Sequence, residues 1–264
     1  MLGAIIGDIA GSRFEFHNHR SKEFDLFAKD CFVTDDSVMT LAVAKAILSC
    51  KGDWELLGNN TVKFMQSLGR KYPHCGYGGM FRKWLVSDNP KPYNSYGNGA
   101  AMRVSACGFI AQSEEEAKLL SKKVTEVTHN HPEGLKGAEA AVVAIFLARN
   151  GKSIEEIKNR IEKDYYSLDF TIDSVREYYQ FNETCQETVP QAIRAFIESL
   201  SFEDAIRNAI SIGGDSDTLA AITGGIAEAH YGIPDEIKQQ ALKFLKNDLY
   251  DIYNEWRLQQ ASKK

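Results

Sequence analysis

The chain has 264 residues, of which 44% are hydrophobic and 25% are charged, and its formal net charge is −5. This length accommodates one large domain or two small ones, and the composition is that of an ordinary globular protein with a substantial core. The slight negative charge and the lack of any basic run in the sequence exclude a surface that holds nucleic acid by bulk attraction, whereas a local site for a small anion stays open.

The sequence predicts neither a signal peptide nor a membrane-spanning segment. Its start has no basic region and reaches Asp8 early, and no apolar stretch approaches the roughly 20 residues that cross a bilayer. The cysteines form no CxxC pair, which favours free thiols in a reducing compartment (Cys31, Cys50, Cys75, Cys107 and Cys185). We therefore expect a cytoplasmic protein.

Apolar residues recur at helical spacing along most of the chain. In chain order, the predicted helices cover residues 38–48, 104–111, 114–127, 137–149, 154–163, 191–200, 202–212, 219–231 and 237–260. Pro190 and Pro234 are expected at helix starts, where a missing N–H is tolerated. The stretch at residues 170–172 is too short to support a sheet. With no repeat and no linker, the sequence predicts an all-α fold in a single domain over residues 1–264.

Two clusters of hydroxyl and carboxylate groups precede predicted helices, at residues 34–37 (Thr-Asp-Asp-Ser) and 213–218 (Gly-Gly-Asp-Ser-Asp-Thr). Capping of the first helical turn accounts for one carboxylate in each cluster. A second carboxylate beside a buried face is costly, so four aspartates that converge at one place would require a cation. Oxygen ligands without nearby cysteine or paired histidine suit Mg²⁺, Mn²⁺ or Ca²⁺ rather than zinc, and four aspartates can hold two ions.

Other polar residues point to the same region less directly. Glu15 lies between two phenylalanines and is either a solvated loop residue or a group that faces the metal and activates water. His129 and His131 lack a third zinc ligand, so they are hydrogen-bonding residues, one of which could line a cleft. Glycine-rich loops at residues 76–79 and 97–99 allow backbone N–H groups to approach an anion, although helix capping explains them equally well.

Five short motifs occur in a fixed order along the chain. They are GDxxGSxxE at 7–15, TDDS at 34–37, SYGNGAAMR at 95–103, THxHP at 128–132 and GGDSDT at 213–218. Each is weak alone, but the ordered set resembles the ADP-ribosylglycohydrolase family, which includes dinitrogenase-reductase-activating glycohydrolases and ADP-ribosyl-acceptor hydrolases. The resemblance implies a compact orthogonal helical domain with a metal cleft at helix N-termini and a binuclear Mg²⁺ or Mn²⁺ centre.

The resemblance also implies roles for individual residues. The metal ligands would be Thr34, Asp35, Asp36, Asp215, Asp217 and Thr218. The catalytic residues would be Glu15 and Asp36. The loop that wraps the diphosphate of ADP-ribose would be Gly76, Tyr77, Gly78 and Gly79. Further contacts to ADP-ribose would come from Ser95, Tyr96, Gly97 and Asn98, with Tyr96 stacking on adenine, and from His129. By composition alone, Tyr96 is expected to pack in the core. Residues 152–190 match no motif and are expected to shape the acceptor side.

The resulting hypothesis is a metal-dependent hydrolase that releases ADP-ribose from an ADP-ribosylated protein, nucleic acid or small molecule by water attack at the anomeric carbon. The motifs do not choose among arginine, serine, a nucleic-acid base and a small metabolite as the acceptor. We expect a monomer with no membrane partner. Two alternatives stay open, a non-catalytic ADP-ribose or nucleotide-binding module and another magnesium-dependent hydrolase of nucleotide-like small molecules.

Overall fold

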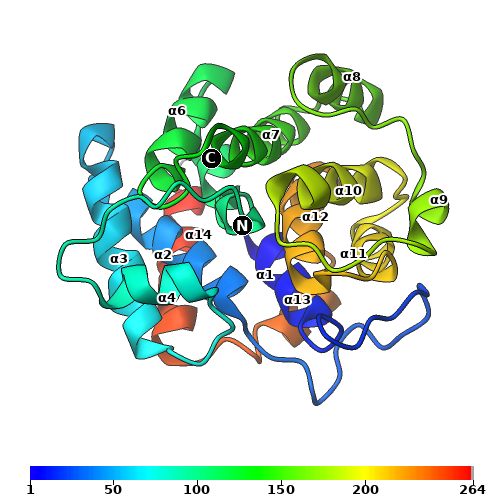
Figure 1. The fold of residues 1–264 in the computed structure, drawn as a ribbon, viewed down its shortest axis with the longest axis horizontal. Helices are drawn as coiled ribbons and strands as arrows, with labels where there is room; N and C mark the ends of the chain where they lie inside the picture. The colour runs from blue at the N-terminus through cyan, green and yellow to red at the C-terminus, as the bar shows by residue number, and fades with distance from the viewer. Residues whose placement is uncertain (263–264) are drawn as a thin grey trace.

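In the computed structural model, which describes residues 1–262, every regular element is a helix (Figure 1). The first half of the chain contains α1 (Leu2–Gly11), α2 (Asp35–Cys50), η1 (Trp54–Leu56), α3 (Leu57–Lys71), α4 (Gly79–Val86), η2 (Asn98–Ala100), α5 (Ser105–Ile110) and α6 (Glu114–Thr125). The second half contains α7 (Pro132–Arg149), α8 (Ile154–Asp164), α9 (Ile172–Arg176), α10 (Cys185–Ile197), α11 (Phe202–Ser211), α12 (Ser216–Tyr231), α13 (Asp235–Ala241) and α14 (Asn247–Ala261).

The two innermost helices, α1 and α12, lie side by side in the middle of Figure 1. All of α1 is buried, as are residues 216–227 of α12, so both helices need neighbours on every side. Their backbones approach closely: a Cβ on Gly7 would lie 2.0 Å from the carbonyl oxygen of Ala220, and one on Gly11 would lie 2.5 Å from the Cα atom of Asp217. Only glycine fits at these two positions, which fixes the register of α1 against α12.

The remaining helices surround this pair. In Figure 1, α2, α3 and α4 lie on one side of it, α10 and α11 lie on the other, and α6, α7 and α8 lie above. Helix α2 packs against α1, while α10 and α11 pack against α12. As a result, the N-terminal ends of α2 and α12 meet beside the C-terminal end of α1.

The prediction of an all-α fold is confirmed, and most predicted helices coincide with observed ones. The expectation for Pro190 is wrong, because α10 begins at Cys185 and Pro190 lies inside it. Pro190 lies in the second turn, where it removes one hydrogen bond of the helix, and the helix continues past it. Pro234 directly precedes α13, as expected. The predicted helix over residues 237–260 is instead two helices, and Asn247 at the break has a φ of 51°, which a continuous α-helix does not allow.

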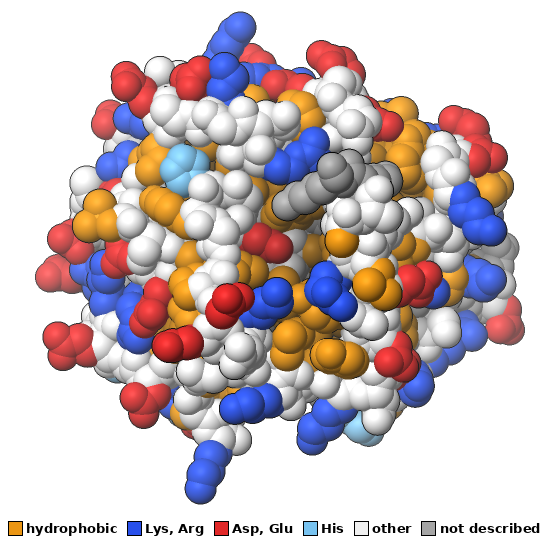
Figure 2. All heavy atoms as spheres, turned by 180° about the vertical axis from the view of Figure 1, so that it is seen from behind, with side chains coloured by type: hydrophobic (Ala, Val, Ile, Leu, Met, Phe, Trp, Pro, Cys, Tyr) orange, Lys and Arg blue, Asp and Glu red, His pale blue; other side chains and the backbone are white. Residues whose placement is uncertain are grey.

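Among the helices of residues 1–262, none combines the length and apolarity of a membrane span. All five cysteines are free, as the sequence predicts. Acidic and basic side chains are interspersed over the face of the molecule shown in Figure 2.

Candidate functional site

The acidic residues at the start of α2 are held by a buried carboxylate from α1. Thr34 caps α2, since its Oγ1 accepts a hydrogen bond from the backbone N–H of Asp36 at 3.2 Å. Beneath the cap, Asp8 accepts hydrogen bonds from Oγ1 of Thr34 at 2.6 Å, from its N–H at 3.1 Å, and from the N–H of Ser37 at 3.0 Å. Asp8 is fully buried and thereby fixes the first turn of α2 on α1.

Sequence reasoning assigned no role to Asp8, although it lies in the first motif. A signal was present: Asp8 is the only charged residue between Leu2 and Gly11 in an otherwise apolar stretch. A carboxylate in such a stretch must find donors when it is buried, and here the donors come from the start of a different helix.

The second acidic cluster lies directly opposite the first. Gly213 and Gly214 both have positive φ angles, of 80° and 71°, and turn the chain into α12. Oγ1 of Thr218 then donates to Oδ2 of Asp36 at 3.1 Å, which joins the two helix starts. Nδ2 of Asn98 donates to Oδ2 of Asp215 at 2.7 Å. The predicted convergence of the two clusters at one place is therefore found in the structure.

These largely buried carboxylates repel one another. Burial, and then the charge of neighbouring carboxylates, raises the pKa of Asp35, Asp36 and Asp217 well above the usual range. Burial also raises the pKa of Asp215, and it raises that of Asp8 to about 6 against the hydrogen bonds that Asp8 accepts. No lysine or arginine within residues 1–262 forms a salt bridge with any of the five. This concentration of negative charge, which no basic side chain of the described residues balances, suits a bound cation.

The oxygen atoms that face one another also fit a metal. Oδ1 of Asp36 and Oδ1 of Asp217 are buried and have no hydrogen-bond partner within the described chain. Carboxylate oxygens of Glu15, Asp215 and Asp217 lie within 4.8 Å of one another. Since every candidate donor is a carboxylate or hydroxyl oxygen, the set suits a hard divalent ion of the magnesium type.

Glu15 reaches this cluster from the loop between α1 and α2. Its side chain is half-buried, and burial followed by the charges of Asp215, Asp8 and Glu183 raises its pKa to about 7. Of the two expectations for Glu15, a solvated loop residue or a group that faces the metal site, the structure favours the latter. A carboxyl group with such a pKa can exchange protons near neutral pH.

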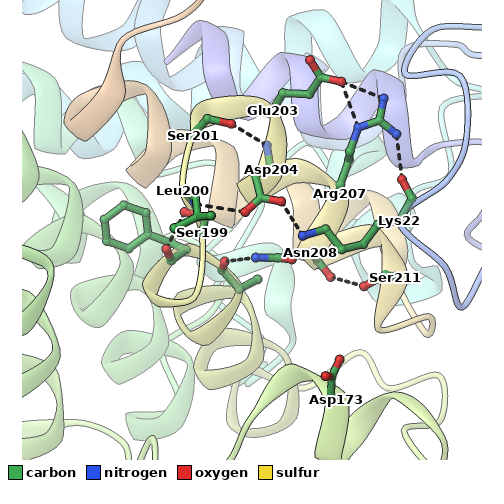
Figure 3. Close-up of polar contacts among 12 residues, drawn as sticks. Lys22, Asp173, Ser199, Leu200, Ser201, Glu203, Asp204, Arg207, Asn208 and Ser211 are labelled. Carbon is green, nitrogen blue, oxygen red and sulfur yellow. Dashed lines mark hydrogen bonds and ion pairs between the residues drawn. The ribbon is translucent and has the colours of Figure 1, made fainter.

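The loop that carries Glu15 is attached to the other side of the site. Asn18 exchanges two hydrogen bonds with the backbone of Gly214, at 2.9 and 3.0 Å. Figure 3 shows Lys22 of this loop beside α11, where its ammonium pairs with Asp204 and its carbonyl accepts a hydrogen bond from Arg207 at 2.8 Å. These hydrogen bonds fasten the loop to α11 and to the start of α12, and they thereby hold Glu15 in place relative to α12.

A cavity of about 580 Å³ connects the acidic cluster to the glycine-rich loops. Such a volume is typical of a site for a drug-sized or nucleotide-sized ligand. We call the part formed by Glu15, Asp35, Asp36, Asp215 and Asp217 the acidic end, and the part formed by residues 95–98, Arg103 and His129 the loop end. Most of the predicted site residues line it, namely Glu15, Asp35, Asp36, Gly76, Gly78, Gly79, Ser95, Tyr96, Gly97, Asn98, His129, Asp215, Asp217 and Thr218.

Two predicted residues are outside the cavity wall. The hydroxyl of Thr34 points to Asp8, beneath the acidic end. The side chain of Tyr77 is buried in the core with its ring centroid 5.6 Å from that of Phe81, so only the backbone of its loop faces the cavity.

The loop end differs from the sequence-based expectation in two details. The N–H of Gly97 donates to Ser95 and the N–H of Asn98 donates to the carbonyl of Glu183, so these two groups are not free to hold an anion. Tyr96 was expected to pack in the core on composition alone, but its side chain is 46% exposed beside the ring of His131. It is therefore available to stack on a planar ligand.

Comparison with known proteins identifies the fold and the family. The profile of the ADP-ribosylglycohydrolase family matches residues 1–263. The chain belongs to this family. Its similarity to ADP-ribosylhydrolase ARH3 of Mus musculus is 25% identity over 94% of this chain and 88% of the relative. For the ADP-ribosyl-[dinitrogen reductase] glycohydrolase of Rhodospirillum rubrum the identity is 24% over 89% of this chain and 85% of the relative.

Two further comparisons agree. ADP-ribosylarginine hydrolase Tri1 of Pseudomonas putida is 24% identical over 95% of this chain and 76% of its own length. A solved structure described as an ADP-ribosylglycohydrolase-related protein complex has a TM-score of 0.69 and 21% identity, covering 97% of this chain and 94% of that one. The predicted family and helical fold are confirmed, and this member of the family is a hydrolase of ADP-ribosyl bonds.

Proposed function

We propose that this ADP-ribosylglycohydrolase is metal-dependent and releases free ADP-ribose by attack of water on the anomeric carbon of the ADP-ribosyl group. The observation that carries the proposal is the meeting of Asp36 with Thr218 at the acidic end, where two helix starts bring together carboxylates that have no salt bridge within the described residues. The cavity leads from there to the glycine-rich loop at residues 76–79, which suits a diphosphate.

The proposed metal ligands are Thr34, Asp35, Asp36, Asp215, Asp217 and Thr218, holding two ions, Mg²⁺ or alternatively Mn²⁺. Thr34 can donate its hydroxyl hydrogen to Asp8 and still offer a lone pair, which is compatible with a ligand role. A bound divalent ion supplies positive charge that orients the distal ribose and stabilises the charge developing at the reacting centre.

The chain's own residues carry the proton steps. Glu15 accepts a proton from the attacking water as its oxygen bonds to the anomeric carbon, and the bond from that carbon to the acceptor breaks. Glu15 then returns this proton to the departing acceptor, for arginine the guanidine nitrogen, so that the carboxylate is restored. Asp36 accepts a hydrogen bond from Thr218 and is proposed to hold the starts of α2 and α12 together during this step.

The other parts of ADP-ribose are assigned along the cavity. We propose that the loop at residues 76–79 wraps the diphosphate and that the exposed ring of Tyr96 stacks on adenine. His129 lies in the cavity wall behind Gly97 and is proposed to contact an oxygen of the ligand.

For the acceptor we propose an arginine-type cation. Glu183 and Thr184, from the segment that matches no family motif, line the cavity, and the Glu183 side chain is exposed. Next to Glu15, the ring of Phe16 stacks on that of Phe181 with centroids 5.9 Å apart, and both rings are exposed. A carboxylate that has no salt bridge within residues 1–262, two positions after a stacked aromatic ring, favours a planar guanidinium over a serine hydroxyl. One relative carries the name ADP-ribosylarginine hydrolase, which is consistent with this choice.

The test is release of free ADP-ribose from arginine-, serine- and nucleic-acid-linked substrates, with Mg²⁺ and with a chelator. We expect metal-dependent release from the arginine linkage. Release from another linkage alone would replace the acceptor and keep the reaction. Binding of ADP-ribose without release from any linkage would reduce the protein to a binding module, and release of phosphate would identify another hydrolase. We further propose that the protein is a monomer, which gel filtration checks, and that it is located in the cytoplasm.

A further inference from the structure

Arg103 is a fully buried cation in the wall of the loop end. It is 1% exposed and lines the cavity, yet it forms no salt bridge with any carboxylate of residues 1–262. Its Nη2 donates to Oγ1 of Thr128 at 2.6 Å, and more weakly to the carbonyl of Val124 at 3.4 Å. A buried guanidinium is costly unless its hydrogen bonds are used, so the short bond to Thr128 is the main fixed contact that the protein supplies.

The hydrogen bond from Arg103 limits the partners to which the hydroxyl of Thr128 can donate. With one lone pair directed at Arg103, the single hydroxyl hydrogen has two acceptors within reach. Nδ1 of His129 lies at 2.7 Å, whereas the carbonyl of Thr125 lies at 3.4 Å. The shorter contact is the better hydrogen bond, which favours donation of the hydroxyl hydrogen to Nδ1 over donation to Thr125. A neutral imidazole that accepts at Nδ1 carries its hydrogen on Nε2.

Nε2 of His129 faces the glycine-rich loop at residues 97–99, which lines the cavity. A Cβ placed on Gly99 would lie 3.4 Å from it and one on Gly97 would lie 3.6 Å from it. Within the described chain, this nitrogen has no hydrogen-bond partner. Burial, and then the charge of Arg103, lowers the pKa of His129 well below its usual range, so the ring is neutral. In a neutral ring the choice of tautomer decides whether Nε2 donates or accepts.

We propose that Arg103 is a positioning residue that acts through Thr128 to hold His129 as an Nε2–H donor directed at an oxygen of the bound ADP-ribose. The inference rests on the proposed function for the identity of the ligand, but the tautomer is a property of the protein alone. It adds to the family assignment a chain of three side chains, Arg103 from the turn between η2 and α5, and Thr128 and His129 from the α6–α7 connection.

The first test is the ¹⁵N spectrum of the His129 ring in the ligand-free protein, because protonated and unprotonated ring nitrogens have different chemical shifts. We expect an unprotonated Nδ1 and a protonated Nε2 in the wild type and in Thr128→Ser, which keeps the hydroxyl. In Thr128→Val we expect the two tautomers to mix. A hydrogen on Nδ1 in the wild type would overturn the proposal.

The second test is calorimetric titration with ADP-ribose. Thr128→Val should weaken binding roughly tenfold, the scale of one hydrogen bond, whereas Thr128→Ser should bind as the wild type does. The matched control is Thr125→Val, because Thr125 is equally buried and its hydroxyl has no partner within the described chain. Equal affinities for Thr128→Val and Thr125→Val would overturn the proposal.

Two further variants probe the donor itself. His129→Gln places an amide N–H close to the position of Nε2, whereas His129→Asn places one close to Nδ1, so the glutamine variant should retain more affinity. The reverse order would contradict the assignment. If the wild type does not bind ADP-ribose at all, the proposed function fails, while the ¹⁵N spectrum still decides the tautomer.

Discussion

The acidic end and the loop end of the cavity have opposite electrostatic character but share one property. At the acidic end, five carboxylates meet without a salt bridge to any lysine or arginine of the described chain, and at the loop end Arg103 lacks a carboxylate. Proteins usually neutralise buried charges internally, because desolvating an unpaired charge is expensive. The comparison teaches that neither end is electrically complete on its own, so a cation at one end and an anion at the other would stabilise both.

The largest effect is expected from neutralising one carboxylate of the acidic end. Asp217→Asn should lower turnover by about 1000-fold, since it removes a proposed metal ligand. The Tm of the metal-free variant should not fall, because one of several mutually repelling carboxylates is lost. Steady-state kinetics and thermal melts with and without Mg²⁺ check both statements. Asp169→Asn, at an exposed position, is the control, and a strongly destabilised metal-free Asp217→Asn would argue that the cluster is structural.

A change at Glu15 should separate chemistry from binding. Glu15→Gln keeps the size and hydrogen-bonding capacity of the side chain but cannot take a proton from water, so turnover should fall on the order of 100-fold or more. Affinity for ADP-ribose, which is proposed to depend on the loop at residues 76–79, the loop end and the metal ligands, should change little. Single-turnover kinetics together with calorimetry measure the two quantities, and full activity in this variant would remove Glu15 from the mechanism.

A smaller effect is expected beneath the acidic end. Asp8→Asn retains one carbonyl oxygen where the carboxylate accepts hydrogen bonds from both Thr34 and Ser37. The start of α2 should therefore be held less well, and affinity for Mn²⁺ should fall about 10- to 100-fold, as for other residues that orient metal ligands. Titration followed by electron paramagnetic resonance measures this affinity. An unchanged affinity would limit Asp8 to a role in folding.

The smallest effect concerns the acceptor. Glu183→Gln should raise KM for an arginine-linked substrate roughly severalfold, the scale of one partly exposed ion pair, and leave a serine-linked substrate unaffected. Glu187→Gln is the matched control, because Glu187 is on the same segment but outside the cavity wall. If both substrates respond equally to Glu183→Gln, the residue does not select the acceptor.

Amphipathic helices were only partly predicted, since α11 was predicted over nearly its full length whereas α3, which also has a polar and an apolar face, was missed. Helix α1 was missed as well, because a short run that is apolar on nearly every side does not distinguish a helix from a strand. The split between α13 and α14 was missed because the apolar spacing continues across a backbone break at Asn247.

The site could be predicted to the extent that its chemistry is local in the sequence. Two carboxylates at one helix start are visible as a motif, and they meet those of the other helix as expected. The roles of Asp8 and Arg103 depend on partners that only the fold supplies, Thr34 for the first and Thr128 for the second. The exposure of Tyr96 was equally hidden, since composition does not reveal which ring lies beside a cavity.

The close contact between α1 and α12 has a consequence for protein engineering. Since a methyl group on Gly11 would collide with the Cα atom of Asp217, the spacing of the acidic end is set by two main chains and hardly at all by adjustable side chains. Attempts to stabilise this enzyme by filling its interior should therefore avoid the glycines of α1 and begin at its periphery. Conversely, anyone transplanting the acidic centre into another scaffold would have to carry both helices as one unit.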